Sequence, residues 1–242
     1  MFFCPRIFPG FFIFLLMNGE YMEKLELNKV YCMDCLEFMK SLPDDYFDLL
    51  LTDPPYGIGY GEMLKGKGDG NGGIDKNGWK SYNCPDWDRF KPSEEYFKEM
   101  IRVSKNQIIW GGNYFIEYLK PSMCWLVWNK GQRGFSLADG ELAWTSYNKA
   151  LRIFDYSRGK FLNDINEKRE HPTQKPVKLG YWILKMFAKE GYKIFDPFAG
   201  SGSFLLACKH KGFDFVGCEL NKEYVNICNK RLNQSNIKEW FE

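Results

Sequence analysis

The sequence predicts an α/β protein in which helices cover both faces of a mostly parallel, seven-stranded sheet. Two observations predict this class. From Leu25 onward, short apolar runs alternate with amphipathic stretches of helical period, which is typical of parallel strands joined by helices. Several apolar runs, such as residues 49–51, carry no polar side chain, as is typical of strands buried on both faces. A chain of 242 residues, 45% apolar and 26% charged, is large enough to bury such a core.

Each expected strand is a short apolar run, and the seven runs are residues 30–32, 47–52, 107–110, 124–128, 141–145, 193–195 and 215–219. The clearest helix covers residues 176–189, where apolar side chains recur at helical spacing after Pro176. A second helix is expected to begin at Ser93, with glutamates in its first turn. A third runs over residues 34–42, where Glu37 stands three residues after an aspartate, as in a capping box.

Two segments are not expected to enter the core. Residues 57–83 are rich in glycine, lysine, asparagine and aspartate, which predicts a surface loop long enough to have a function. Residues 146–170 are polar, with interspersed tyrosine and phenylalanine.

The overall composition excludes several classes of protein. The 33 basic and 31 acidic side chains leave a formal charge of +2, so any surface that binds nucleic-acid phosphates must be local. Eight cysteines show no regular spacing, which favours a reduced, cytoplasmic setting over a disulfide scaffold. Cys32 and Cys35 form a C-x-x-C pair without a second pair, and the chain has two histidines. We therefore expect buried thiols and no metal site.

The N-terminus differs from the rest of the chain. Residues 7–17 are apolar but too short to span a bilayer, so no membrane partner is expected. The stretch resembles the apolar region of a signal peptide. A start codon placed too early, with the working protein beginning at Met17 or Met22, is the favoured alternative. We expect residues 1–21 to lie outside the fold and residues 22–242 to form one domain.

The first motif that carries chemistry lies between the expected strand at 193–195 and a helix. It consists of Asp196, Pro197, Phe198, Ala199, Gly200, Ser201, Gly202 and Ser203. Paired glycines let the backbone approach a ligand, and the first turn of a helix offers N–H groups to an anion. The third glycine of the dinucleotide fingerprint is absent, because Leu205 occupies its place. Glu219 ends the next strand, where an acid accepts hydrogen bonds from a ribose, so the unit predicts a nucleoside cofactor.

The second motif, Thr52-Asp53-Pro54-Pro55-Tyr56-Gly57, lies at the carboxyl end of the strand at 47–52. Open parallel sheets bind ligands beyond the carboxyl ends of their strands, so this motif and the glycine turn should face one crevice. The prolines fix the backbone and leave their carbonyls as acceptors. Asp53 adds a carboxylate acceptor and Tyr56 a flat aromatic face. Two acceptors beside a stacking surface suit an exocyclic amino group on a flat ring.

Asp53-Pro54-Pro55-Tyr56, taken with Phe198-Ala199-Gly200-Ser201-Gly202, resembles the amino-methylating DNA methyltransferases that use S-adenosylmethionine. The D-P-P-Y block precedes the F-x-G-x-G block, as in the beta arrangement of that family. The resemblance covers residues 25–232. It implies a circularly permuted, Rossmann-like sheet that opens with the third and fourth strands of the fold and returns late to the first and second.

The resemblance implies that Asp53, Pro54, Pro55 and Tyr56 form the catalytic site. A flipped-out nucleotide would stack on Tyr56, while Asp53 and the Pro54 carbonyl accept its amino hydrogens, without a metal. The expected target is N6 of adenine in DNA, because an aspartate at the first position usually accompanies adenine in the family. N4 of cytosine and an RNA substrate are alternatives. Outside this chemistry, an NAD-type oxidoreductase or a binding protein without turnover are the remaining hypotheses.

The resemblance also implies a cofactor site for S-adenosylmethionine. The glycine turn and Glu219 would hold the nucleoside. Asp34 would approach the cofactor adenine, or alternatively only cap the helix that follows it. Thr173 and Lys175 would lie near the methionyl end, where a cation suits the carboxylate.

Segments 57–90 and 146–170 are the candidates for DNA recognition. Residues 146–178 carry eight basic and four acidic side chains, a balance that suits contact with phosphates. A homodimer and a cognate restriction endonuclease are further partners that the resemblance suggests and the residues leave open.

Overall fold

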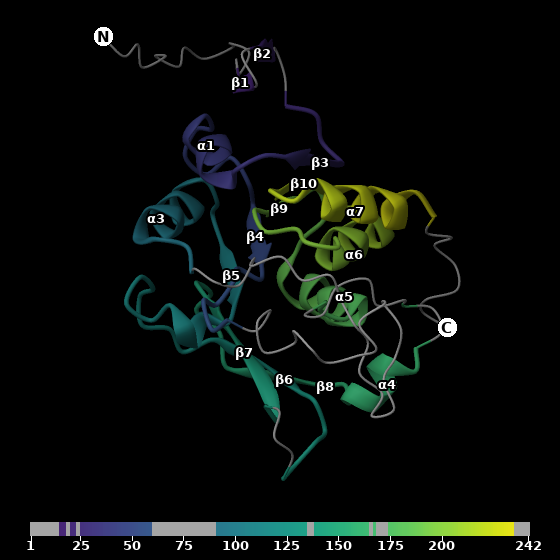
Figure 1. The fold of residues 1–242 in the computed structure, drawn as a ribbon. Coiled ribbons are helices and arrows are strands. Elements are labelled where there is room, and N and C mark those ends of the chain that lie inside the picture. Colours follow the sequence, from purple (N-terminus) through teal and green to yellow (C-terminus); the bar gives the residue numbers. More distant parts are fainter. Residues whose placement is uncertain are drawn as a thin grey trace.

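The computed structural model describes residues 15–17, 20–22, 25–59, 91–134, 138–164, 167 and 174–234. Most of the predicted loop at 57–83, and Thr173, lie outside these residues. Strands β1 (Leu15–Met17) and β2 (Glu20–Met22) pair with each other as a separate antiparallel sheet, apart from the main sheet in Figure 1. No helix among the described residues combines the length and hydropathy needed to cross a membrane.

The main sheet has eight strands. They are β3 (Lys29–Cys32), β4 (Leu49–Thr52), β5 (Gln107–Trp110), β6 (Trp125–Asn129), β7 (Gly140–Thr145), β8 (Arg152–Asp155), β9 (Lys193–Asp196) and β10 (Asp214–Glu219). Their order across the sheet is β3-β10-β9-β4-β5-β7-β6-β8. All described pairings are parallel except those of β7, which runs against β5 and β6. The seven expected strands are all present, and β8 adds an eighth at the edge.

The strand order confirms the circular permutation that the resemblance implies. β3 and β4 come early in the chain, yet β10 and β9, which come last, lie between them. The centre of the sheet therefore joins the two ends of the domain, where Leu49 of β4 pairs with Ile194 of β9. This arrangement brings the strand end that carries Asp53 beside the turn that carries Gly200.

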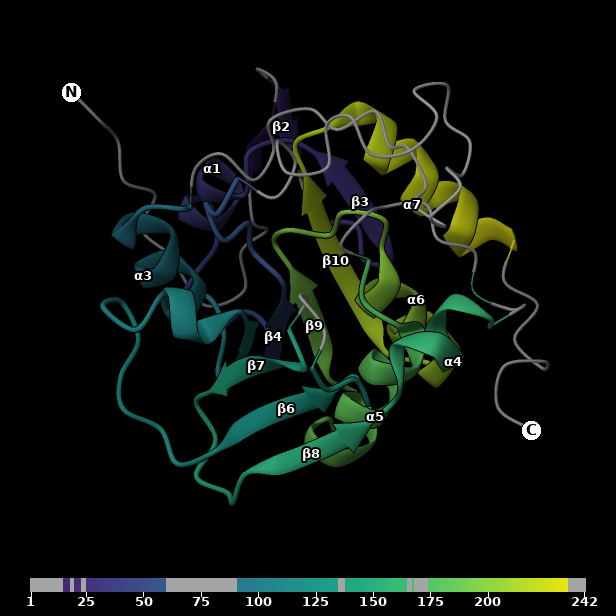
Figure 2. The same ribbon diagram turned by 60° about the horizontal axis from the view of Figure 1, so that its bottom comes forward.

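Helices cover both faces of the sheet, as expected (Figures 1 and 2). On one face lie α1 (Cys35–Lys40) and α3 (Glu94–Arg102). On the other lie α5 (Val177–Phe187), α6 (Ser203–Lys211) and α7 (Lys222–Gln234). Each face packs its own apolar cluster: Leu49 and Leu51 point to the α5 side, while Leu50 points to the α1 side. Alternation along a strand that is buried on both faces explains the continuous apolar run.

The start of α1 follows the residue that predicted it. Asp34 caps α1, because its side chain accepts a hydrogen bond of 2.8 Å from Leu36 N. Asn221 caps α7 by accepting from Glu223 N at 2.8 Å. The capping box expected at Glu37 is not formed. The Glu37 carboxylate instead pairs with Lys40 Nζ, 3.5 Å away on the exposed face of α1.

Residues 146–170 correct one prediction, because part of this segment enters the core. It forms β8 and α4 (Arg158–Leu162), and Tyr156 and Phe161 are buried. Phe154 on β8 packs against Trp182 of α5, with ring centroids 5.3 Å apart. β8 is an edge strand with exposed polar side chains, so its sequence lacks the apolar run that predicted the other strands.

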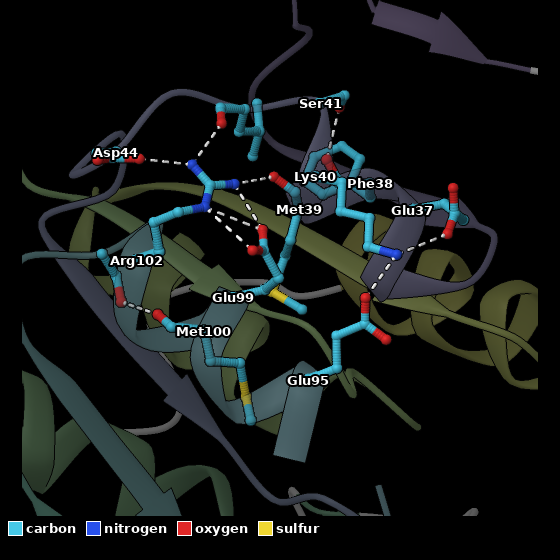
Figure 3. Close-up of polar contacts among 12 residues, drawn as sticks. Glu37, Phe38, Met39, Lys40, Ser41, Asp44, Glu95, Glu99, Met100 and Arg102 are labelled. Carbon is cyan, nitrogen blue, oxygen red and sulfur yellow. Dashed lines mark hydrogen bonds and ion pairs between the residues drawn. The ribbon is translucent and has the colours of Figure 1, made fainter. Parts of the chain in front are cut away.

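One arginine ties α3 to the end of α1 (Figure 3). Arg102 donates hydrogen bonds of 2.7 Å to the Met39 carbonyl and 2.8 Å to the Leu42 carbonyl. The same guanidinium pairs with Glu99 at 2.6 Å and Asp44 at 2.8 Å. Carbonyls at a helix end have no partner inside the helix. Arg102 therefore adds a charged donor to the end of α1, where Ser41 and Leu42 already donate to the Phe38 and Met39 carbonyls.

Replacing Arg102 with methionine is expected to lower the free energy of unfolding by about 2 kcal/mol, because two carbonyls and two carboxylates lose a shared donor. Urea denaturation measures this change. Arg102→Lys should recover only part of the loss, since one ammonium group cannot reproduce a planar fork of donors. Lys98→Met, on an exposed part of the same helix, is the control and should change stability by less than about 0.5 kcal/mol. Equal losses in Lys98→Met and Arg102→Met would contradict this role.

Candidate active site

One cavity of about 950 Å³ opens at the carboxyl ends of the parallel strands. The predicted site residues that line it are Asp34, Asp53, Pro54, Pro55, Tyr56, Lys175, Asp196, Pro197, Phe198, Gly200, Ser201, Ser203 and Glu219. Gly202 does not line it, and Thr173 lies outside the described residues. The two sequence motifs therefore share one cavity, although 140 residues separate them.

The glycine turn is held by Glu219 at the end of β10. Its carboxylate accepts a hydrogen bond of 2.9 Å from Gly200 N and one of 2.8 Å from Asn221 N. Gly200 has a positive φ of 52°, and a Cβ built on it would meet no atom within 4 Å, so its backbone is open to a ligand. Gly202, with φ of 79°, faces away, and a Cβ there would lie 2.2 Å from Cys228 Sγ. Gly202 thus permits the close approach of α7.

Asp196 joins this turn to the Asp53 strand. Its Oδ1 accepts hydrogen bonds from Thr52 Oγ1 at 2.7 Å and Phe198 N at 3.1 Å. Asp196 is 2% exposed, and burial raises the pKa of its carboxyl to about 7 despite these two donors. The buried Asp196 carboxyl at the end of β9 is therefore hydrogen-bonded to Thr52 at the end of β4.

A ring of polar contacts supports the other side of the turn. The buried Glu167 carboxylate accepts hydrogen bonds from Val177 N at 2.9 and 3.0 Å, and lies 3.6 Å from Arg231. Arg231 donates to the Ser201 carbonyl at 2.7 Å. Ser201 Oγ donates to Gln174 Oε1 at 3.2 Å, and Gln174 donates to Glu167 at 3.3 Å. These contacts fix Ser201 between α5 and α7.

The raised pKa values of two buried carboxyls predict a pH dependence of stability. Burial raises the pKa of Glu167 to about 7, as it does for Asp196. Between pH 4 and 7 these two carboxyls lose their protons in the unfolded chain but keep them in the folded protein. The free energy of unfolding therefore falls as pH rises, by at most about 1.4 kcal/mol per pH unit for each carboxyl. Asp196→Asn cannot ionise. Its stability relative to the wild type, measured by urea denaturation, should rise between pH 5 and 7, and a constant difference would contradict the assignment.

Asp53 lines the cavity and contacts two polar side chains. Tyr56 OH donates a hydrogen bond of 2.6 Å to Asp53 Oδ1, and Lys175 Nζ pairs with Oδ2. Lys175 Nζ also lies 3.3 Å from Tyr56 OH. Burial raises the pKa of Asp53, while the Lys175 ammonium opposes that shift. The structure thus places Lys175 beside the D-P-P-Y motif, and a ligand in the cavity would meet the two together.

The Tyr56 ring is confined by residues that follow β5. Tyr114, in a short 3-10 turn (Gly112–Tyr114), stacks on Tyr56 with ring centroids 4.7 Å apart and an interplanar angle of 16°. Gly111 has φ of 67°, and a Cβ there would lie 2.1 Å from Tyr56 Cε1. Only glycine fits at that position. A ligand that stacks on the Tyr114 side of Tyr56 must displace the half-exposed Tyr114 ring.

Asp34 follows β3, the edge strand of the sheet, whereas Tyr114 follows β5 near the middle of the strand order. Besides capping α1, its carboxylate accepts from Tyr96 OH, at 2.9 Å and 3.1 Å. The Tyr96 ring also packs against Phe198, with centroids 6.2 Å apart. The capping role of Asp34 is confirmed, and its carboxylate also faces the cavity. The two alternatives that the sequence left open for Asp34 are therefore compatible.

Several residues of this site were not predicted from the sequence. Glu141, at the start of β7, pairs with Lys175 at 3.0 Å and with Lys130. Two sequence patterns could have identified residues of this cavity. Glu141 is an acid at the start of an apolar strand, and Tyr114 closely follows a Gly-Gly pair at the carboxyl end of β5. No local pattern marks Glu167, whose partners Gln174 and Val177 follow in the next segment and whose partner Arg231 lies on α7.

Comparisons with known proteins agree with the geometry. Residues 125–230 match the N6/N4 methyltransferase family model, described as DNA methylase. The type II methyltransferase M.HinfI of Haemophilus influenzae is 28% identical over 250 residues, which cover 86% of this chain and 69% of that protein.

Two solved structures share the fold. The crystal structure of the M1.HpyAVI–SAM complex has a TM-score of 0.53 and 23% identity, and the match covers 85% of this chain and 98% of that one. The cytosine-N4-specific PvuII DNA methyltransferase has a TM-score of 0.55 and 16% identity, over 86% of each chain. These likenesses confirm the expected α/β methyltransferase fold. The sequence matches add that residues 125–230 resemble the N6/N4 DNA methylases and that the chain as a whole is similar to amino DNA methyltransferases.

Proposed function

We propose that this protein transfers a methyl group from S-adenosylmethionine to the N6 amino group of adenine in a flipped-out nucleotide of DNA. One observation carries the proposal: the acceptor groups of the D-P-P-Y motif and the open backbone of the glycine turn line the same cavity. Its volume of about 950 Å³ is at the upper end of the range for small-molecule sites. The cavity thus has room for a methyl donor and part of a second ligand.

The residues at the glycine turn fit the cofactor. The Glu219 carboxylate keeps free lone pairs beside its two backbone donors, which suits ribose hydroxyls. Gly200 leaves its backbone accessible, and Asp34 and Phe198 offer a carboxylate and a ring for the adenine. When bound, S-adenosylmethionine supplies an electrophilic methyl group. The known complex of M1.HpyAVI with this cofactor supports the same choice here.

The D-P-P-Y motif orients the target. The Asp53 carboxylate and the Pro54 carbonyl accept hydrogen bonds from the amino group, which directs the nitrogen lone pair toward the cofactor side of the cavity. Tyr56 offers an aromatic face to the base and keeps Asp53 in place through its hydroxyl. The methylated nitrogen must lose a proton. Burial raises the pKa of Asp53, which makes this carboxylate a better proton acceptor than an exposed aspartate.

The described part of segment 146–170 is the proposed DNA-contacting surface. Arg158, Phe161 and Leu162 of α4 border the cavity, so α4 lies where an extruded nucleotide would enter. A cation at this border suits the phosphates that flank a flipped base. Segment 57–90 stays a candidate from the sequence alone.

The target base is tested by nucleoside analysis. Purified protein is incubated with tritium-labelled S-adenosylmethionine and unmethylated DNA, and the digested nucleosides are separated. The account predicts label in N6-methyladenine, because Asp53 holds the first position of its motif. Label in N4-methylcytosine would favour transfer to cytosine, the alternative that the shared fold of the cytosine-N4-specific PvuII enzyme keeps open. Label only in a parallel RNA sample would reject DNA as the substrate. No transfer to either polymer would reject the proposal.

A further inference from the structure

A second carboxylate lies beside Asp53. Glu141 lines the cavity with a side chain that is 23% exposed. Its Oε2 lies 3.0 Å from Lys175 Nζ, and its Oε1 pairs with Lys130. Lys175 in turn pairs with Asp53. The four side chains form a row in which carboxylates and ammonium groups alternate, in the order Asp53, Lys175, Glu141 and Lys130.

The direction of β7 explains how Glu141 reaches this place. Among the described strands of the main sheet, β7 alone runs antiparallel to its neighbours. The amino end of β7 therefore lies beside the carboxyl ends of the other strands. Glu141 is opposite Trp128 in the register of β6 and β7, so Lys130, two residues after Trp128, emerges at the same end of the sheet. The backbone thus fixes one carboxylate and one ammonium group beside the Asp53 motif.

The contacts divide the charge of Lys175 between two carboxylates. Lys175 is 5% exposed; burial opposes its positive charge, but Asp53 and Glu141 together raise its pKa. Burial also opposes the ionisation of Glu141, yet Lys175 and Lys130 lower the pKa of this carboxyl to about 2. Both groups are therefore charged at neutral pH. With Asp53 as its only carboxylate partner, Lys175 would stabilise the Asp53 anion more strongly.

We propose that Glu141 is a positioning residue, which shares the Lys175 ammonium with Asp53 and so weakens the hold of Lys175 on the carboxylate that must accept the amino group of the target base. The inference rests on the proposed function of Asp53. Glu141 acts through Lys175 and needs no contact with the reacting atoms. Without Glu141, the target amino group would compete with the full charge of an ammonium donor for the same oxygen.

The other groups around Asp53 come from separate elements. Tyr56 donates to Asp53 Oδ1, and Tyr114 stacks on the far side of the Tyr56 ring. Asp196, at the end of β9, and Asp53 repel each other when both are ionised. A neutral replacement of Glu141 leaves these groups in place. A changed titration of Asp53 in such a variant would therefore come from the loss of the Glu141 charge and the response of Lys175.

Two neutral substitutions give opposite expectations. Single-turnover rates of methyl transfer from labelled S-adenosylmethionine to unmethylated DNA are measured across pH 5 to 9. Glu141→Gln should lower the rate about 10-fold, because Lys175 would then hold the Asp53 carboxylate in a less productive position, and should move the acid limb of the profile to lower pH. Lys130→Gln strengthens the attraction of Glu141 for Lys175, so it should move the acid limb to higher pH. Glu141→Asp keeps the charge and should recover part of the rate.

The controls separate this inference from the proposed function. Glu95→Gln, an exposed charge on α3 that pairs with Lys40, should match the wild type in rate and profile. The dissociation constant of S-adenosylmethionine, measured by calorimetry, should change little in every variant. Wild-type profiles in both Glu141→Gln and Lys130→Gln, or shifts in the same direction, would overturn the inference. If Glu141→Gln fails to fold, the Lys130→Gln profile decides alone.

An Asp53→Ala variant shows which statement has failed. If Asp53→Ala abolishes transfer while the Glu141 and Lys130 variants keep wild-type profiles, the role of Glu141 is wrong and the proposed function stands. If Asp53→Ala remains fully active, the proposed function is wrong, and the inference about Glu141 fails with it.

Discussion

Replacing Asp53 with alanine is expected to lower the single-turnover rate of methyl transfer by about 10³-fold or more, in the range found for removal of a group that acts on the reacting atoms. The substitution removes the carboxylate acceptor of the amino group and the partner of Tyr56 OH. It leaves the glycine turn and Glu219 in place, so binding of S-adenosylmethionine should persist. Rapid-quench measurement with labelled cofactor gives the rate, and calorimetry gives the dissociation constant.

The control for this change is Asp214→Ala. Asp214 is the first residue of β10, at the opposite end of the strand from Glu219, and its exposed carboxylate accepts a hydrogen bond from Asn28. Its loss should leave the transfer rate unchanged. If Asp53→Ala bound cofactor normally and transferred methyl groups at the wild-type rate, the catalytic site would lie elsewhere in the protein.

Replacing Glu219 with alanine is expected to weaken binding of S-adenosylmethionine by about 10- to 100-fold, the equivalent of one or two hydrogen bonds to a charged group. The carboxylate is the proposed acceptor for the ribose, and it also holds Gly200 N and Asn221 N. Glu219→Gln keeps an acceptor oxygen and should lose less affinity than Glu219→Ala. Isothermal calorimetry measures all three proteins directly.

The matched control is Glu223→Ala, in the first turn of α7 and exposed to solvent. It removes the same charge four residues away and should bind S-adenosylmethionine as the wild type does. Unchanged affinity in Glu219→Ala would show that the nucleoside does not lie at the end of β10.

The elements that were predicted from the sequence are those whose signals are local. Buried parallel strands such as β4 need continuous apolar runs, and the cap at Asp34 satisfies an N–H group two residues away. The two motifs were also found to share a crevice, because the end of a parallel strand fixes where the next residues lie. Local chemistry was therefore sufficient for most of the sheet and for the predicted side chains around the cavity.

The remaining features depend on contacts between distant segments. Glu167 is buried through Val177 and Arg231, and a single glutamate in a polar stretch gives no sign of that. Glu141 reaches the cavity because β7 is antiparallel, whereas strand direction was not assigned from the sequence. β8 was missed because an edge strand keeps exposed polar side chains.

The most direct test of the account is a crystal structure of the protein bound to sinefungin, an amine analogue of S-adenosylmethionine. The account predicts that the ribose of the ligand contacts Glu219 and that its adenosine follows the glycine turn at Gly200. Its amine, which takes the place of the transferable methyl group, should point toward Asp53 and Pro54. Ligand bound outside this cavity, or bound with its amine directed away from Asp53, would contradict the claim that the two motifs form a single site.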